Sequence, residues 1–133
     1  MQSITVGTKT RIQAVDITKD VEAVVRKSGV SEGIAHLYVS HTTAGIFINE
    51  HDDPAVAEDI MTTLAAMVPH SGKYKFMHSE GNSDSHIKAV MVGNSVMVPI
   101  TGGWLGLGRW QGIFFAEFDG PRTRNVQVVI TKS

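Results

Sequence analysis

The chain has 133 residues, of which 42% are hydrophobic and 19% are charged, and its formal net charge at pH 7 is -1. This length and composition predict one globular domain over 1–133, large enough to fold without disulfides or structural metals. The near-zero net charge excludes an overall basic field that would attract nucleic acid. The absence of cysteine excludes disulfides, thiolate zinc sites and a cysteine nucleophile.

Residues 1–16 alternate polar and apolar side chains and lack the unbroken apolar core of a signal peptide. No stretch of the chain reaches the roughly 18 apolar residues of a membrane span. We therefore expect a soluble, cytoplasmic protein whose partners include neither nucleic acid nor a membrane.

Strands and single helices alternate in the first half of the chain. Ile4 and Val6, followed by Ile12 and Ala14, predict a pair of strands around a turn at Gly7. Further strands are expected over 34–41 and 45–50, where apolar residues alternate with polar ones or run together.

Both helices of this half carry recognisable end signals. Thr18 is a suitable N-cap for a helix over about 19–27, and Gly29 lies where that helix would end. Asp53-Pro54 marks a second helix start, because Asp accepts hydrogen bonds from the unpaired N–H groups and Pro fits the first helical position. This second helix is expected to continue to about Met67.

Strands dominate the second half of the chain. A third helix is expected over 82–92, opened by Asn82 and closed by Gly93. Strands are then expected over 95–100, 109–118 and 125–131, with a turn at Gly102-Gly103. Because the last three strands follow one another without helices, we predict an α+β fold. It would be a mostly antiparallel β-sandwich with two to three packed helices in a single domain, not a doubly wound parallel sheet.

Several polar residues fall where the local period calls for apolar side chains. His41 has the strand parity of Leu37 and Val39, and His86 shares a helix side with Ala89 and Val90. A buried imidazole or carboxylate is costly unless it is paired or bound, so one shared pocket explains several such residues together. Taken singly, each is more often a satisfied core group or a solvated strand end. The other side chains with this property, which are candidate catalytic residues, are Glu50, Gln111 and Glu117.

The three imidazoles of His41, His78 and His86 could hold a divalent metal, zinc or magnesium, and leave one position for water or substrate. Glu50 or Glu117 could then act as a general base or orient a ligating His. The His spacing matches no standard short motif. The alternative, a hydrogen-bonded His/Glu cluster that binds phosphate or another anion directly, therefore stays open.

Basic and amide side chains supply candidates for binding a phosphate group. Arg122 lies in a turn directly after a polar-faced strand, and its planar guanidinium matches the geometry of phosphate oxygens. Most surface arginines are only solvated, so each candidate alone is weak. The other candidates are Lys88, Arg109, Arg124 and Asn82.

Two further motifs predict chemistry less well. The glycine-rich run 102–108 leads into a strand, so it lacks the helix N-terminus that a nucleotide-binding loop needs. Ser40, Thr42 and Thr43 beside His41 raise the idea of a Ser/His hydrolase, but the sequence contains no G-x-S-x-G nucleophile elbow.

Three blocks of the sequence resemble signatures of the YjbQ-like family. They cover nearly the whole chain in the same order, which makes the resemblance specific. The blocks are HTTAGIFINE with the following Asp53-Pro54, HSEGNSDSHIK over 78–88, and a third made of 95–99, 108–113 and 117–122.

The resemblance implies a small β-rich domain related to jelly-roll sandwiches, assembled as a homotrimer with pockets near subunit boundaries and a His-lined site for a metal or an oxyanion. It also implies a thiamine-phosphate synthase activity. This transferase reaction joins a pyrimidine pyrophosphate to a thiazole phosphate and releases pyrophosphate. Arg109 stands where the family commonly has threonine. Its parity with Gln111 favours a side chain that points into the pocket.

The leading hypothesis is therefore a metal-assisted enzyme acting on a phosphorylated small molecule. Arg122 and Lys88 would neutralise the charge that develops as pyrophosphate leaves. The same pocket could instead serve a non-catalytic module that binds a metal or a phosphorylated metabolite. A third hypothesis makes the His/Glu cluster a hydrogen-bonded network at the trimer interface.

Overall fold

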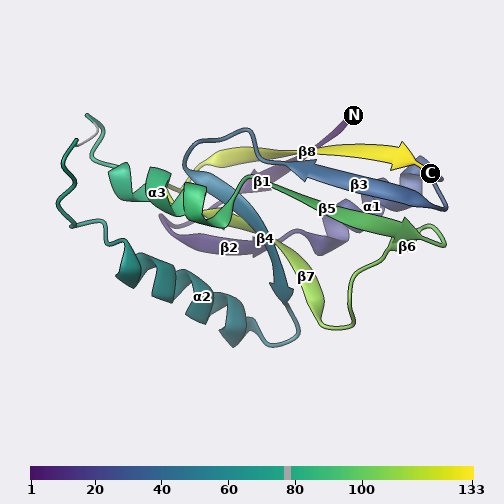
Figure 1. Cartoon of the computed structure of the whole chain (residues 1–133), viewed down its shortest axis with the longest axis horizontal. Helices are drawn as coiled ribbons and strands as arrows, with labels where there is room; N and C mark the ends of the chain where they lie inside the picture. Colours follow the sequence, from purple (N-terminus) through teal and green to yellow (C-terminus); the bar gives the residue numbers. More distant parts are fainter. Residues whose placement is uncertain (77–78) are drawn as a thin grey trace.

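The computed structural model describes residues 1–76 and 79–133. In this part of the chain, two antiparallel sheets and three helices form the α+β fold expected from the sequence (Figure 1). The larger sheet has the strand order β1-β8-β3-β5-β6, and the smaller sheet has the order β2-β7-β4. The elements are β1 (Gln2–Gly7), β2 (Gln13–Asp16), α1 (Thr18–Ser28), β3 (Gly33–Tyr38), β4 (Ala44–Glu50), α2 (Pro54–Met67), α3 (Ser83–Val92), β5 (Ser95–Thr101), β6 (Trp104–Leu105), β7 (Gln111–Glu117) and β8 (Thr123–Lys132).

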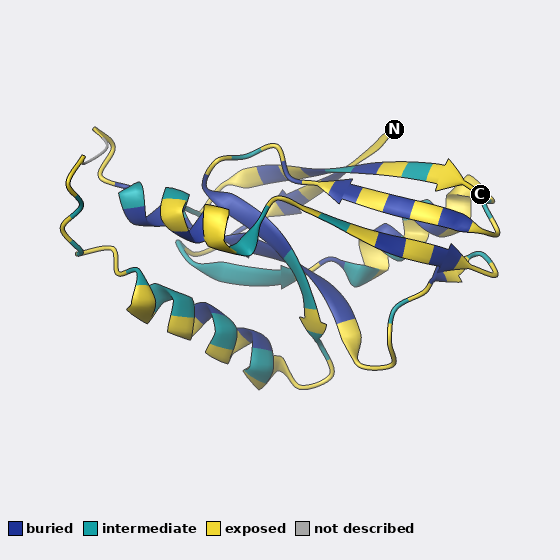
Figure 2. Ribbon diagram, viewed as in Figure 1, coloured by how far each residue is buried: buried dark blue, intermediate teal, exposed yellow. Residues whose placement is uncertain are grey.

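The main hydrophobic core lies between the two sheets. Buried and exposed residues alternate along β3 and β5, which gives these strands the banded colouring of Figure 2. Leu37 from the larger sheet and Ile46 from the smaller sheet belong to the same buried cluster. Val21 and Val25 on α1 complete this cluster at one side of the sandwich.

The smaller sheet is buried on both faces. Its central strand β7 contains the apolar run 113–116, which is buried throughout, as expected for a strand covered on each side. On the face away from the main core, α2 and α3 cover the sheet, and Met61 and Ala89 pack there against Phe118. The three layers are therefore the larger sheet, the smaller sheet and the α2–α3 pair.

The expected pairing of the two N-terminal strands is wrong. β1 pairs with β8 in the larger sheet, whereas β2 pairs with β7 in the smaller one. Gly7 does not adopt the positive φ that a tight hairpin turn would use. Instead, the segment 8–12 crosses between the sheets, and its backbone is bonded to the β7–β8 connection.

Most other element predictions hold with shifted ends. Thr18, however, is the first residue of α1 and not its N-cap, a position that Ile17 occupies without a side-chain capping bond. Gly102 and Gly103 form the expected turn after β5, both with positive φ (57° and 83°), a conformation that glycine adopts without a Cβ clash. β3 ends at Tyr38, so His41 lies in the β3–β4 connection and not on the strand. None of the helices in the described part of the chain is long and apolar enough to cross a membrane.

Candidate functional site

Segments distant in sequence meet at one end of the sandwich and enclose a hollow of about 350 Å³, which we call the polar cleft. The sheet register explains the meeting, because the start of β4 lies beside the end of β7, with Ala44 opposite Glu117. The β3–β4 connection, the β7–β8 connection, the start of β8 and the segment 80–86 all contribute. The lining residues are Ser40, His41, Thr42, Thr43, Glu80, Asn82, His86, Asp119, Arg122 and Arg124.

A buried ion pair supports the base of the polar cleft. Glu117 is fully buried and accepts hydrogen bonds from both Nε and Nη2 of Arg124. Arg124, only 5% exposed, also donates from Nη2 to Thr43 Oγ1 at 2.8 Å. Burial by itself raises the pKa of Glu117, but hydrogen bonds from Arg124, the Asp119 N–H and Thr8 outweigh it and lower the pKa. Glu117 is therefore an ionised positioning residue and holds Arg124 in place.

The β7–β8 connection is held against the segment after β1. Thr8 Oγ1 donates to Glu117 Oε1 at 2.8 Å and accepts from the Arg122 N–H at 2.9 Å. Gly120 must be glycine for this approach, since a Cβ there would lie 2.4 Å from the Thr10 carbonyl oxygen. These contacts fix the backbone from which Arg122 projects.

The Arg122 guanidinium is held in place and yet open to solvent. It donates from Nε to the Asp119 carbonyl at 2.8 Å and from Nη2 to Asp119 Oδ2 at 3.0 Å, while half of the side chain is exposed. Asp119 Oδ2 also accepts from Asn82 Nδ2 at 2.9 Å. Burial raises the pKa of Asp119, but the hydrogen bonds from Asn82 and Arg122 lower it overall. Asp119 therefore holds Arg122 in place at the lining of the polar cleft.

His41 presents a fixed tautomer to the cleft. Its Nε2 lies 3.0 Å from the Asn125 backbone nitrogen. Because a backbone N–H can only donate, Nε2 must carry the lone pair, and the proton of the neutral ring sits on Nδ1. Burial and the nearby Arg124 charge lower the pKa of His41 from its ordinary value of 6.5, against a smaller opposing effect of the Glu117 charge. The ring is thus neutral at pH 7 and offers a ligand an N–H donor.

The sequence of the whole domain matches the family model described as UPF0047 protein YjbQ-like, over residues 2–133. The chain belongs to the YjbQ-like family. It is 50% identical over 125 residues to a UPF0047 protein of Methanocaldococcus jannaschii, covering 94% of this chain and 89% of that protein. It is 41% identical over 128 residues to the UPF0047 protein YugU of Bacillus subtilis, with 96% of each chain covered.

Solved structures of YjbQ-like proteins show the same fold. A crystal structure of an uncharacterised YjbQ/UPF0047 protein from Clostridium acetobutylicum has a TM-score of 0.94 and 48% identity, covering 98% of this chain and all of that one. A YjbQ-like protein of unknown function from Sulfolobus solfataricus also has a TM-score of 0.94, at 37% identity, with 99% and 96% covered. Neither protein is described by an activity, so the chemistry rests on the residues of this site.

Of the predicted site residues, those brought together in the polar cleft are His41, His86, Asn82, Arg122 and Arg124. Asn82 precedes α3 but makes no side-chain capping bond. Its Oδ1 is buried without a hydrogen-bond partner among the described residues. His78 lies outside the described residues. Within residues 1–76 and 79–133, no group of three or more His, Cys, Asp or Glu side chains is placed to hold a metal.

Three predicted site residues of this YjbQ-like chain lie at the opposite end of the smaller sheet. Glu50 pairs in register with Gln111, whereas Glu117 lies six residues further along β7, roughly 20 Å away at 3.3 Å per residue. Gln111 is exposed, not inward, and its Oε1 accepts from the Gly108 N–H at 2.8 Å. Arg109 is exposed and stacks on Trp110, 4.7 Å from the ring centroid. The expectation that Arg109 points into the pocket is therefore wrong, since it precedes β7 and has no strand parity.

Lys88 does not lie where the sequence prediction of a phosphate-binding residue requires. It is fully buried and donates from Nζ to Asp84 Oδ2 at 2.9 Å and to the Val68 carbonyl at 3.0 Å, so it joins α3 to the end of α2. Burial raises the pKa of Asp84, but hydrogen bonds from Arg11, His70 and Lys88 lower it strongly. Lys88 therefore has a structural role in the α2–α3 layer and does not face the cleft.

Sequence reasoning missed two parts of this arrangement. The Asp84–Lys88 pair has the i, i+4 spacing of a helical ion pair, a signal that could have identified it. The position of Asp119 beside Arg122 depends on the shape of the β7–β8 connection, which leaves no periodic signal.

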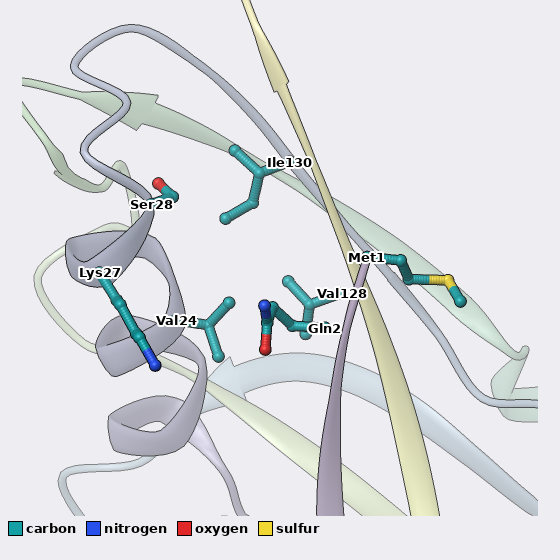
Figure 3. A pocket seen from close by; sticks show the side chains of 7 residues that line it. All are labelled: Met1, Gln2, Val24, Lys27, Ser28, Val128 and Ile130. Carbon is teal, nitrogen blue, oxygen red and sulfur yellow. The ribbon is translucent and has the colours of Figure 1, made fainter.

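A separate hollow of about 300 Å³ lies between α1 and the β1–β8 pair, away from the polar cleft, and Val24 faces Val128 there (Figure 3).

Proposed function

We propose that the polar cleft binds a phosphorylated small molecule, and that the chain is a transferase of the thiamine-phosphate synthase kind. The observation that carries this proposal is a set of hydrogen-bond donors fixed before any ligand arrives. Arg122 is anchored by Asp119 while half of its side chain remains exposed, and His41 is fixed as the Nδ1–H tautomer. Donors held in position bind a phosphate group without a further ordering cost.

In the proposed reaction, the thiazole nitrogen attacks the methylene carbon of the pyrimidine, and the carbon–oxygen bond to pyrophosphate breaks as the carbon–nitrogen bond forms. The nitrogen uses its own lone pair, so no proton has to be removed from it. The demand falls on the departing pyrophosphate, whose growing negative charge needs fixed donors. Arg122 and the His41 N–H supply them, and a buried Glu117 that serves only to hold Arg124 is compatible with such a step.

The charge of the polar cleft suits a divalent cation, but only some of its side chains are suitable ligands for one. Arg124 is already paired with Glu117, so the carboxylates of Glu80 and Asp119 face only the charge of Arg122, and a phosphate group alone meets a lining without excess positive charge. A bound divalent cation would supply the excess positive charge that stabilises a leaving pyrophosphate. Glu80 and His86 offer the oxygen and nitrogen donors that such cations accept. His41 does not fit as a ligand in its present orientation, because its lone pair is bonded to the Asn125 N–H.

Calorimetric titration of untagged protein with pyrophosphate, with and without magnesium, tests ligand binding. We expect binding that tightens when magnesium is present. Arg122→Ala should weaken it by about tenfold, since a hydrogen bond to a charged group contributes about 1.5–3 kcal/mol. Arg109→Ala removes the same charge at the far end of β7, beyond the screening length of about 8–10 Å. It is the matched control and should leave affinity unchanged.

Turnover separates the enzyme from a binding module. If purified protein supplied with magnesium or zinc binds pyrophosphate but converts neither the thiamine precursors nor a panel of phosphate esters, the non-catalytic module replaces the enzyme. Equal affinity in the Arg122→Ala variant and the parent would reject the cleft itself as the phosphate site. Elemental analysis of the untagged protein identifies any retained metal.

We also propose that the chain assembles as a homotrimer through the outer face of its larger sheet. This face carries Ile34, Tyr38, Met97 and Val129 exposed by 42–65%. None of its described outward residues is charged, which is typical of the centre of protein interfaces. Asn125 on this face bonds His41, so the assembly would border the polar cleft. The outward residues are Ser3, Thr5, Ile34, His36, Tyr38, Ser95, Met97, Pro99, Thr101, Thr123, Asn125, Gln127, Val129 and Thr131.

Light scattering after size exclusion measures the assembly. We expect the mass of a trimer for the parent protein and the mass of a monomer for Met97→Glu, because a carboxylate at the centre of an uncharged face cannot be desolvated without a partner. Met67→Glu changes an equally exposed methionine on α2 and should leave the trimer intact. A monomeric parent would reject this assembly.

A further inference from the structure

A second hollow adjoins the polar cleft and differs from it in chemistry. Its volume is about 490 Å³, and we call it the apolar cleft. The two clefts share His41, Thr42 and His86, so these side chains form the boundary between them. The residues that line the apolar cleft alone are Ala44, Ala89, Val90, Gly93 and Asn94.

Three backbone groups of Gly93 and Asn94 beside the apolar cleft are already paired. The Gly93 carbonyl accepts from the Ile46 N–H at 3.0 Å, and the Asn94 carbonyl accepts from the Val39 N–H at 2.8 Å. The Gly93 N–H is bonded to the Ala89 carbonyl at 2.9 Å. The wall therefore offers few hydrogen-bonding groups to a ligand and mainly presents carbon atoms.

The side chains of the apolar cleft form a floor and a rim. Ala89 is 7% exposed and packs among buried residues at the bottom, whereas Val90 is 82% exposed at the edge. Covering such an exposed apolar side chain with the carbon surface of a ligand removes it from water, and this burial lowers the free energy of the complex. Both lie on the same side of α3 as His86, so one helix face runs from the polar boundary to the apolar rim.

We infer that the apolar cleft holds the carbon skeleton of the ligand whose phosphate occupies the polar cleft. The inference rests on the proposed function, because it needs the phosphate placed beside Arg122 and His41. It adds a ligand class, a phosphate ester carrying a flat or compact apolar group next to the phosphate. Ala89 and Val90 then determine specificity, Ala89 through the depth of the floor and Val90 through the apolar rim.

Calorimetric titration with inorganic phosphate, methyl phosphate and phenyl phosphate, all in magnesium-containing buffer, tests the inference. We expect phenyl phosphate to bind about tenfold more tightly than methyl phosphate. This corresponds to burial of about 55 Å² of apolar surface at about 25 cal/mol per Å². Ala89→Leu fills the floor and should abolish the preference while inorganic phosphate still binds as in the parent.

A second variant keeps the inference testable if Ala89→Leu fails to fold. Val90→Asn keeps the charge of the rim and lies at an exposed position, and we expect it to reduce the phenyl preference to about threefold or less because part of the buried apolar area is lost. Ala66→Leu and Val56→Asn make the same substitutions on α2 and should retain the full preference.

The outcomes separate this inference from the proposed function. Equal binding of methyl and phenyl phosphate overturns the inference and leaves the phosphate site standing. A phenyl preference that survives both Ala89→Leu and Val90→Asn places the ring elsewhere and also overturns it. If inorganic phosphate, methyl phosphate and phenyl phosphate all fail to bind, the proposed phosphate site is wrong, and the inference falls with it.

Discussion

Glu117→Gln is expected to lower the free energy of unfolding by about 3 kcal/mol, because it leaves the buried Arg124 guanidinium without its counter-ion. The amide keeps the size of the side chain, so little of the loss can be assigned to packing. One Glu117 oxygen accepts from Thr8 and Arg124, and an amide NH₂ cannot accept in its place. Urea-induced unfolding followed by circular dichroism measures the change.

The pH dependence of the same variant gives a second readout. Because the folded pKa of Glu117 lies below its ordinary value of 4.5, the stability it contributes is complete above that pH. This stability is lost as the pH falls through the lowered folded pKa. The difference between parent and Glu117→Gln should therefore shrink in acid. Glu58→Gln, at an exposed position on α2, is the control and should change stability by less than about 0.5 kcal/mol. A Glu117→Gln variant as stable as this control would contradict the assigned role.

Lys88→Met is expected to lower the free energy of unfolding by about 3 kcal/mol, since it removes the ammonium that lies against the buried Asp84 carboxylate. Methionine matches the length of the lysine stem, so the core beside Phe118 stays filled. Arg11 and His70 remain bonded to Asp84, which keeps the loss near the lower end of values for broken buried pairs. Thermal and urea unfolding both report the change.

Pyrophosphate titration of Lys88→Met distinguishes the structural role from the phosphate-binding role expected from the sequence. We expect affinity within about twofold of the parent, because Lys88 faces the α2–α3 layer and distant sites add independently. Lys19→Met, exposed on α1, is the control for stability. A loss of pyrophosphate affinity in Lys88→Met, with folding intact, would restore Lys88 to the ligand site.

The elements of the fold were predictable where local rules govern them. The Asp53 carboxylate accepts from the Ala55 N–H at the start of α2, as the Asp-Pro signal predicts. Alternation correctly predicted the strand β3. The burial of both faces of β7 was not predicted, because its faces were assigned from strand parity alone. The pairing of β1 with β8 was not predictable in this way, because strand partners are chosen by contacts far apart in the chain.

The candidate site was predictable in composition and only partly in position. His41, His86, Asn82 and Arg122 converge as expected, although His41 lies in a connection and not on a strand. Glu50 and Gln111 share the apolar parity of Glu117, but parity identifies a face of a strand and says nothing about the end of it. The register of β4 with β7 places Glu117 near the cleft and the other two at the far end.

The sequence alone determined the single α+β domain, the capped start of α2, the positions of most strands and its family, because each depends on local periodicity or on blocks of adjacent residues. Only the tertiary structure decided which charges are ligand-facing and which are internal. Lys88 and Glu117 became buried halves of ion pairs, while Arg122 stayed open to solvent. The physical reason is desolvation. The same charged side chain is a structural tie when packing removes it from water and a binding group when packing leaves it exposed, and packing joins residues that the sequence separates.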